Sequence, residues 1–126
     1  MEIHKIGEHY LVEFIHCNRD ALTRCEVVHP ILISAAEEGN STILSQQFHQ
    51  FSPHGVTGVL LLAESHISIH TWPEHSLAAV DIFTCGDSML PEKIISSLRA
   101  NLGAKEVQVR HIERTERLPE YERLTY

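Results

Sequence analysis

The chain has 126 residues, enough for one ordinary domain and too few for two hydrophobic cores. The apolar fraction of 43% is typical of a globular protein, and the formal charge of −7 argues against a nucleic-acid partner, because basic residues supply most of the affinity for phosphates. No apolar run is long enough to cross a bilayer, and no basic-then-apolar leader follows Met1, so we expect a cytoplasmic protein without a membrane partner.

The cysteine content also argues against two classes of small protein. Cys17, Cys25 and Cys85 are an odd number without CxxC spacing. This pattern disfavours a disulfide scaffold and a zinc knuckle, and it fits a reducing compartment. We therefore expect no metal site.

The N-terminal third predicts a strand followed by a helix. Aliphatic and aromatic residues favour a strand over Tyr10–His16, and Asn18 is placed to cap a short turn. A helix is expected from about Val28 to Glu38, with Pro30 in its first turn and Gly39 as its end. Its buried stripe is expected to consist of Ile31, Leu32, Ala35 and Ala36.

The middle third predicts three strands. Thr42–Phe51 is a polar strand, and a turn follows at residues 52–55. Val56–Ala63 reads VTGVLLLA, and this nearly continuous apolar run predicts a strand buried on both faces. His66–Trp72 alternates instead, so one face is expected to carry His66, Ser68, His70 and Trp72, the lining of a polar cleft.

The last third predicts a strand, a helix and a final strand. Leu77–Cys85 is the next strand, with Asp81, Phe83 and Cys85 on one face. A helix is expected over Pro91–Leu102, ended by Gly103. The last strand is expected over Glu106–Ile112, and the charged tail after Glu113 is expected to be loosely constrained.

The resulting order is β-α-β-β-β-β-α-β. It predicts an α+β fold, a two-layer domain with helices on one face of a largely antiparallel sheet. Because the helices can cover only one face, a second copy of the chain is the simplest cover for the other.

Chemically reactive side chains concentrate at the ends of two neighbouring strands. Ser65 lies where one strand ends and the next begins, His70 follows five residues later, and Cys85 ends the next strand. A hydroxyl at such a bend can attack its own preceding carbonyl if the oxyanion is stabilised. Taken alone, each residue has a more ordinary interpretation, as a turn serine, a hydrogen-bonded histidine and a small buried cysteine.

At these residues the chain resembles the short prokaryotic S-adenosylmethionine decarboxylases, which depend on a pyruvoyl group. The likeness extends from about residue 7 to residue 113 with the motifs in the same order and spacing. The segments that carry it are FHQFSPHGVTGV (48–59), ESH (64–66), HTWPE (70–74) and AVDIFTCG (79–86).

The resemblance implies self-cleavage of a proenzyme between Glu64 and Ser65. The Ser65 hydroxyl attacks the Glu64 carbonyl, and the amide becomes an ester. His70 then removes the Ser65 alpha proton, and elimination and hydrolysis leave a pyruvoyl group. Thr57 occupies the family's hydroxyl position that helps to hold the intermediate. Residues 1–64 become the beta chain and residues 65–126 the alpha chain of a single 1–126 domain.

The same resemblance implies the reaction and its partners. The pyruvoyl ketone forms a Schiff base with the substrate amine and accepts electrons as carbon dioxide leaves. Cys85 is the acid that returns a proton to the alpha carbon, and a thiol suits this role at neutral pH. The implied substrate is S-adenosylmethionine, and the product supplies aminopropyl groups for spermidine. The implied assembly is a homodimer, an αββα sandwich with its sites between protomers.

Two further matches imply substrate-binding residues. Phe51 matches the aromatic side chain that stacks on adenine, and Glu74 matches the carboxylate that binds the ribose hydroxyls. Trp72 is expected either to form a wall of the pocket or to serve a purely structural role. The chain departs from the commonest family pattern at Gln50 and at residues 75–77. Both places lie near the presumed pocket, so the same chemistry acting on arginine or ornithine stays open.

Two hypotheses from different functional classes also stay open. The first is a metal-binding module that uses His66, His70 and His75, but four residues along a strand span about 13 Å, too far for one ion without a sharp bend. The second is an inactive, dimerising homologue, and a chain that never cleaves itself would support it.

Overall fold

The computed structural model describes residues 3–124, which form one six-stranded sheet and two α-helices. The strands are β1 (Lys5–Ile15), β2 (Ile43–Gln50), β3 (Val56–Leu62), β4 (Ser65–Trp72), β5 (Leu77–Thr84) and β6 (Glu106–Thr115). The α-helices are α1 (Cys25–Glu38) and α2 (Pro91–Leu102). Short 3-10 turns follow β1, β4 and β6 as η1 (Arg19–Ala21), η2 (Pro73–His75) and η3 (Glu120–Glu122).

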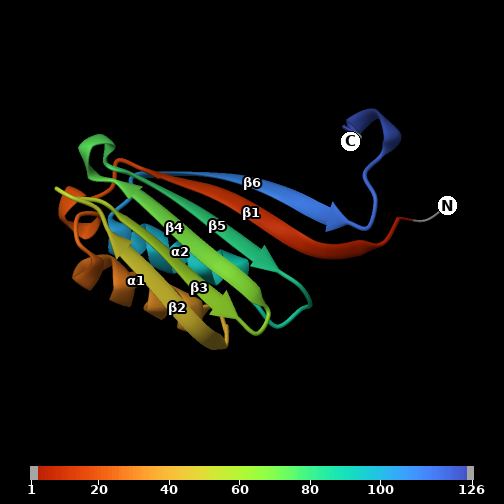
Figure 1. Ribbon diagram of the computed structural model, residues 1–126, viewed down its shortest axis with the longest axis horizontal. Coiled ribbons are helices and arrows are strands. Elements are labelled where there is room, and N and C mark those ends of the chain that lie inside the picture. Colours follow the sequence, from red (N-terminus) through yellow and green to blue (C-terminus); the bar gives the residue numbers. More distant parts are fainter. Residues whose placement is uncertain (1–2, 125–126) are drawn as a thin grey trace.

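The sheet is antiparallel throughout, in the order β2-β3-β4-β5-β1-β6. Both helices pack against the same face, behind the sheet in Figure 1. The two-layer α+β prediction is therefore confirmed. The opposite face of the sheet, here called the open face, has no covering element within residues 3–124.

The hydrophobic core lies between the helices and the sheet, because each strand turns alternate side chains toward them. Helix α1 contributes Val28, Leu32, Ala35 and Ala36, and α2 contributes Ile94, Leu98 and Leu102, all with essentially no exposed surface. The sheet contributes Val12, Phe14, Leu60, Ile67, Ile69, Val80 and Ile82.

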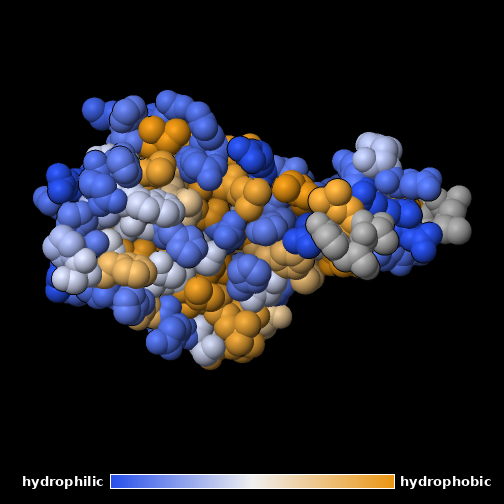
Figure 2. Space-filling view, turned by 45° about the horizontal axis from the view of Figure 1, so that its top comes forward, coloured by the Kyte–Doolittle hydropathy of each residue, from blue (hydrophilic) through white to orange (hydrophobic). Residues whose placement is uncertain are grey.

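Strand β3 corrects one sequence-based expectation. The continuous apolar run predicted burial on both faces, but the observed pattern alternates. Val59 is 40% exposed and Leu61 is 51% exposed, because both point to the open face. Figure 2 shows hydrophobic surface lying beside hydrophilic surface on the molecule.

Several element boundaries also differ from the predictions. Strand β1 begins at Lys5 because its first residues pair only with β6, in the register Lys5↔Thr115. Helix α1 begins at Cys25, so Pro30 is the sixth helical residue and not part of the first turn. The missing N–H of Pro30 leaves a gap in the helical hydrogen bonds. Strand β6 continues to Thr115, so this part of the charged tail is ordered by pairing.

Strands β1 and β6 project beyond the rest of the sheet as a two-stranded arm, with both ends of the described part of the chain near its tip (Figure 1). Among the described residues 3–124, no helix is long and apolar enough to span a bilayer.

Candidate active site

Ser65 and Cys85 lie next to each other at one end of the sheet. Ser65 is the first residue of β4 and pairs with Thr84, the last residue of β5. Cys85 follows directly after β5, and its side chain is exposed. The sequence-based expectation that this hydroxyl and this thiol lie at neighbouring strand ends matches their positions.

The residue before Ser65 is held on both sides by backbone amides. The Cys85 N–H donates to the carbonyl oxygen of Glu64 at 3.3 Å. The Glu64 carboxylate accepts a hydrogen bond from the Thr42 N–H at 3.0 Å. A donor aimed at a carbonyl oxygen stabilises negative charge that develops there when the carbonyl carbon is attacked. The Cys85 N–H is therefore a donor that can stabilise an oxyanion on Glu64.

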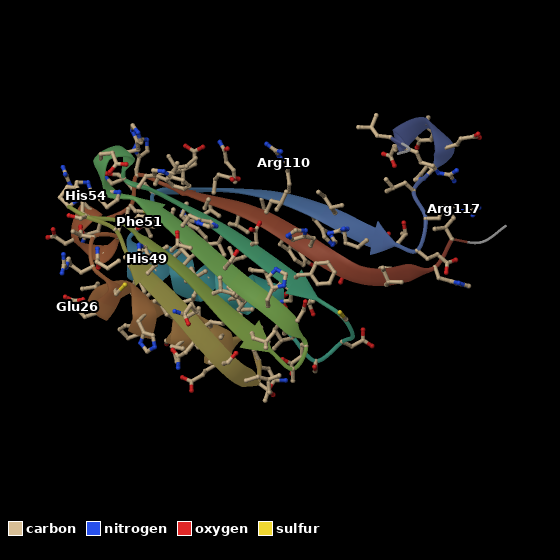
Figure 3. The ribbon with its side chains drawn as sticks, viewed as in Figure 1. Glu26, His49, Phe51, His54, Arg110 and Arg117 are labelled. Carbon is tan, nitrogen blue, oxygen red and sulfur yellow. The ribbon has the colours of Figure 1, made fainter. Side chains whose placement is uncertain are left out.

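The second group of predicted site residues surrounds a cavity at the opposite end of β3 and β4. The cavity measures about 230 Å³ and is open on one side. This volume is below the roughly 300–1,000 Å³ that small-molecule sites usually enclose. Figure 3 shows Phe51 and His54 close together at this end of the molecule. The lining residues are Phe51, His54, Gly55, Thr57, His70, Thr71, Trp72 and Glu74.

Thr57 and His70 face each other across neighbouring strands of this cavity. They are paired in the register of β3 and β4, and the Thr57 Oγ1 lies 3.1 Å from His70 Nδ1. This contact fixes the orientation of the imidazole ring and leaves Nε2 available for proton transfer. The Trp72 ring lies 6.2 Å from the His70 ring, centroid to centroid.

Glu74 carries the one carboxylate that lines the cavity among the described residues. His54 Nε2 lies 2.9 Å from its Oε2. A hydrogen bond from its own backbone N–H, and then the bond to His54, lower the pKa of the Glu74 carboxyl. The side chain therefore stays negatively charged at neutral pH, which suits it to accept hydrogen bonds from hydroxyl groups.

A single chain does not bring Ser65 and Cys85 together with the residues that line the cavity. Ser65 and His70 are five positions apart on β4, which corresponds to about 16 Å along a strand. The predicted site residues thus form two half-sites. One contains the Ser65 hydroxyl and the Cys85 thiol, and the other contains the Thr57 hydroxyl and the His70 imidazole. The convergence of Ser65, His70 and Cys85 that strand-end positions suggested does not occur within one chain.

The geometry of the described residues does not support the metal-binding hypothesis. Within residues 3–124, no three His, Cys, Asp or Glu side chains are close enough together to hold an ion. His66 pairs with Leu61 at the Ser65 end of β4, whereas His70 pairs with Thr57 near the cavity.

Comparison with known proteins decides the family. A family model described as S-adenosylmethionine decarboxylase matches residues 8–115, most of the chain. The chain belongs to the S-adenosylmethionine decarboxylase family. The resemblance noted from the motifs is therefore confirmed.

Individual members of the S-adenosylmethionine decarboxylase family match over most of their length. Proteins named "S-adenosylmethionine decarboxylase proenzyme" from Acidithiobacillus ferrooxidans and Thermotoga maritima are each 42% identical over 109 residues, 86% of this chain and 82% and 84% of theirs. The Thermodesulfovibrio yellowstonii proenzyme is 49% identical over 90 residues, 71% of this chain and 67% of its own. The crystal structure of the adenosylmethionine decarboxylase from Aquifex aeolicus superposes with a TM-score of 0.82 at 39% identity, covering 96% of this chain and 98% of that one.

Sequence reasoning missed two residues that shape the half-sites, and it missed the contacts of a third. Thr42 holds Glu64, and His54 holds Glu74, whereas Gln50, singled out only as a departure from the family pattern, hydrogen-bonds the backbone beneath the cavity. Each partner lies at least 20 positions away in the chain. No local pattern signals such contacts.

Proposed function

We propose that this chain is a proenzyme that cuts its own backbone between Glu64 and Ser65 and then decarboxylates S-adenosylmethionine. The observation that carries the proposal is the hydrogen bond from the Cys85 N–H to the Glu64 carbonyl, directly before Ser65. Relatives named as S-adenosylmethionine decarboxylase proenzymes support it. We place the protein in the cytoplasm.

Self-cleavage proceeds by acyl transfer followed by elimination. The Ser65 hydroxyl attacks the Glu64 carbonyl carbon, the C–N bond breaks, and an ester links the two residues. His70 takes the Ser65 alpha proton, the C–O bond breaks, and Glu64 leaves as a free carboxylate. The dehydroalanine that remains takes up water and releases ammonia. The products are a beta chain of residues 1–64 and a pyruvoyl-capped alpha chain of residues 65–126, within one domain.

The residues around Ser65 fit a pyruvoyl group at this position. The group forms from Ser65 itself, so the chain needs only a strained or polarised Glu64 carbonyl and a nearby acid. When present, the pyruvoyl group accepts the electron pair that decarboxylation releases. Cys85 adjoins this position and returns a proton to the substrate's alpha carbon.

The cavity at the other half-site binds the nucleoside end of the substrate. Phe51 stacks on the adenine and attracts the positive sulfonium, as aromatic faces attract cations. The Glu74 carboxylate accepts hydrogen bonds from the ribose hydroxyls. Trp72 forms a wall of the cavity.

A homodimer completes the site. Because Ser65 and His70 lie at opposite ends of β4, a second copy with reversed strand direction brings His70 of one copy to Ser65 of the other. Packing open face against open face produces this arrangement and covers Val59 and Leu61, which one chain leaves exposed. The assembly is an αββα sandwich with two sites, each built from both copies.

Substrate choice is tested by measuring carbon dioxide release from S-adenosylmethionine, arginine and ornithine. The proposal expects turnover of S-adenosylmethionine alone. Preferred turnover of either amino acid would show the same chemistry acting on a different substrate, and no turnover by a cleaved protein would contradict decarboxylation.

A further inference from the structure

Gln50 is the last residue of β2, and its side chain points away from the cavity. It pairs with Val56, whose side chain is buried against the helices, so Gln50 faces the same side. It does not line the cavity, although Phe51 directly after it does. The departure from the family pattern at Gln50 therefore does not change a wall of the pocket.

The Gln50 amide makes four hydrogen bonds, all to backbone groups. Its Oε1 accepts from the Cys25 N–H at 2.7 Å, at the start of α1. Its Nε2 donates to the carbonyl oxygens of Thr23 at 3.0 Å, Phe51 at 3.0 Å and Gly55 at 3.1 Å. One side chain thus joins the start of α1 to both ends of the 51–55 loop.

Backbone hydrogen bonds link the same groups to one another. The Gly55 N–H donates to the Thr23 carbonyl at 3.1 Å, and the Phe51 N–H donates to the Gly55 carbonyl at 2.8 Å. The loop and the Gln50 amide therefore belong to one connected set of hydrogen bonds. Phe51 and His54 both extend from this loop into the cavity. His54 in turn contacts Glu74, which also lines the cavity.

We propose that Gln50 is a positioning residue for substrate binding: its amide sets the 51–55 loop so that Phe51 and His54 face the cavity. This inference rests on the proposed function, because the ligand of the cavity is the substrate's nucleoside. Only an amide can fill the position fully. It both donates and accepts, whereas a carboxylate only accepts and a guanidinium only donates.

Two variants separate the one hydrogen bond that the Gln50 side chain accepts from the three that it donates. Gln50→Glu has the same shape but faces three carbonyl oxygens without a donor, so the KM for S-adenosylmethionine is expected to rise roughly tenfold or more with kcat within about twofold. Gln50→Arg keeps donors for those carbonyls and loses only the acceptor for the Cys25 N–H. Its KM is expected to rise less than that of Gln50→Glu.

The control for these kinetics is Asn101→Asp, the same amide-to-carboxylate substitution on α2, where the Asn101 amide donates to the Ser97 carbonyl at 3.0 Å, away from the cavity and from the open face. It is expected to leave both constants unchanged. An unchanged KM in Gln50→Glu would overturn the inference, and so would a loss confined to kcat. Equal effects of Gln50→Glu and Gln50→Arg would overturn the assignment to the donor hydrogens.

A second readout does not depend on catalysis. Hydrogen–deuterium exchange of uncleaved Ser65→Ala protein is compared with the same protein carrying Gln50→Glu. The amides of residues 51–55 are expected to exchange faster in the double variant, while those of β4 and β5 are unchanged. Unchanged exchange at 51–55 would refute the positioning role. If the wild-type protein fails to decarboxylate S-adenosylmethionine but the exchange differs as expected, the proposed function fails and the role of Gln50 in ordering the loop stands.

Discussion

The backbone N–H of Cys85 donates a hydrogen bond to the carbonyl oxygen of Glu64 at 3.3 Å, so this residue contacts, through its backbone, the peptide bond that we propose is cut. The side chain is left exposed and free for another task. In the proposed mechanism, self-cleavage and decarboxylation therefore place different demands on Cys85. The first uses an N–H that every residue except proline provides, and the second uses the thiol.

Replacing the thiol should separate the two reactions. Cys85→Ala keeps the backbone N–H, so self-cleavage is expected to continue. Decarboxylation is expected to fall by about 100-fold or more in kcat, because general acids contribute roughly 10²–10⁴-fold. Denaturing gel electrophoresis measures cleavage, and carbon dioxide release measures turnover.

Cys25→Ala is the matched control, since it removes a thiol that does not line the cavity and keeps the backbone N–H from which Gln50 accepts a hydrogen bond. It should cleave and turn over as the wild type does. A Cys85→Ala protein with full turnover would remove Cys85 from the role of acid. One that never cleaves would show that the thiol itself serves self-processing.

The two half-sites predict complementation between inactive chains. Ser65→Ala and His70→Ala should each remain uncleaved alone. When the two variants are expressed together, Ser65 of the His70→Ala chain meets the intact His70 of the other copy. Cleavage is therefore expected to return, and only in the chain that carries His70→Ala.

Mass spectrometry of the mixture identifies the cleaved chain. The Ser65→Ala,His70→Ala double variant, mixed with Ser65→Ala, is the control and should show no cleavage. A mixture of the two single variants that stays whole would mean that each chain processes itself without the other.

The contact between His54 and Glu74 predicts a shift in pH dependence. The pKa of Glu74 is lowered, so its carboxylate keeps its charge as pH falls through the range in which an ordinary glutamate protonates. Substrate binding should weaken only below that range. In His54→Ala the pKa rises toward its ordinary value, and the KM for S-adenosylmethionine should begin to rise at a higher pH.

Glu74→Gln is the control for this titration. It removes the charge at every pH, so KM is expected to rise by roughly 10–100-fold, the loss of a hydrogen bond to a charged group, and to lose the pH dependence. Adding His54→Ala to Glu74→Gln should then change little. A His54→Ala profile identical to that of the wild type would contradict the coupling.

The sequence predicted the layers of the fold because local periodicity decides which face of each element is buried. Ile67 and Ile69 on β4 are buried beside the helices, and the alternate positions face the open side, as predicted. Periodicity failed for β3, whose Val59 and Leu61 are apolar yet uncovered in one chain. It also missed the start of β1, where Lys5 is held by pairing with a residue 110 positions away.

The candidate site was also predictable only in part. The junction at Ser65 and the strand end at Cys85 follow from element boundaries, and the motifs marked Thr57, His70 and Glu74. Their division between two ends of the sheet did not follow, because it depends on strand direction and register. The bond of His54 to Glu74 joins a loop to a turn 20 positions apart, which no sequence period reports.

The proposed dimer interface on the open face predicts that substitutions at two exposed valines differ in their effect on dimerisation. Val59 is 40% exposed on the open face, and Val109 is 48% exposed on the helix side of β6, opposite buried Val12. Val59→Asp places a charge in the proposed dimer interface, where an unpaired charge is costly, and should weaken dimerisation by about 100-fold or more. Val109→Asp should leave the dimer intact. Sedimentation equilibrium measures both.

The proposed site needs both copies, so Val59→Asp should also remain largely uncleaved at concentrations at which it is monomeric. A monomeric protein that cleaves at the wild-type rate would contradict the shared site. A Val59→Asp protein that dimerises as tightly as Val109→Asp would instead place the interface on another surface.

The conversion of Ser65 is read most directly from the intact mass of the purified wild-type protein. We expect two chains that meet at residues 64 and 65. The beta chain should have the mass of residues 1–64 with a free carboxylate, and the alpha chain should be lighter than residues 65–126 by one ammonia. A chain that keeps its full mass after long incubation, or a second fragment with an ordinary serine amine, would contradict the account.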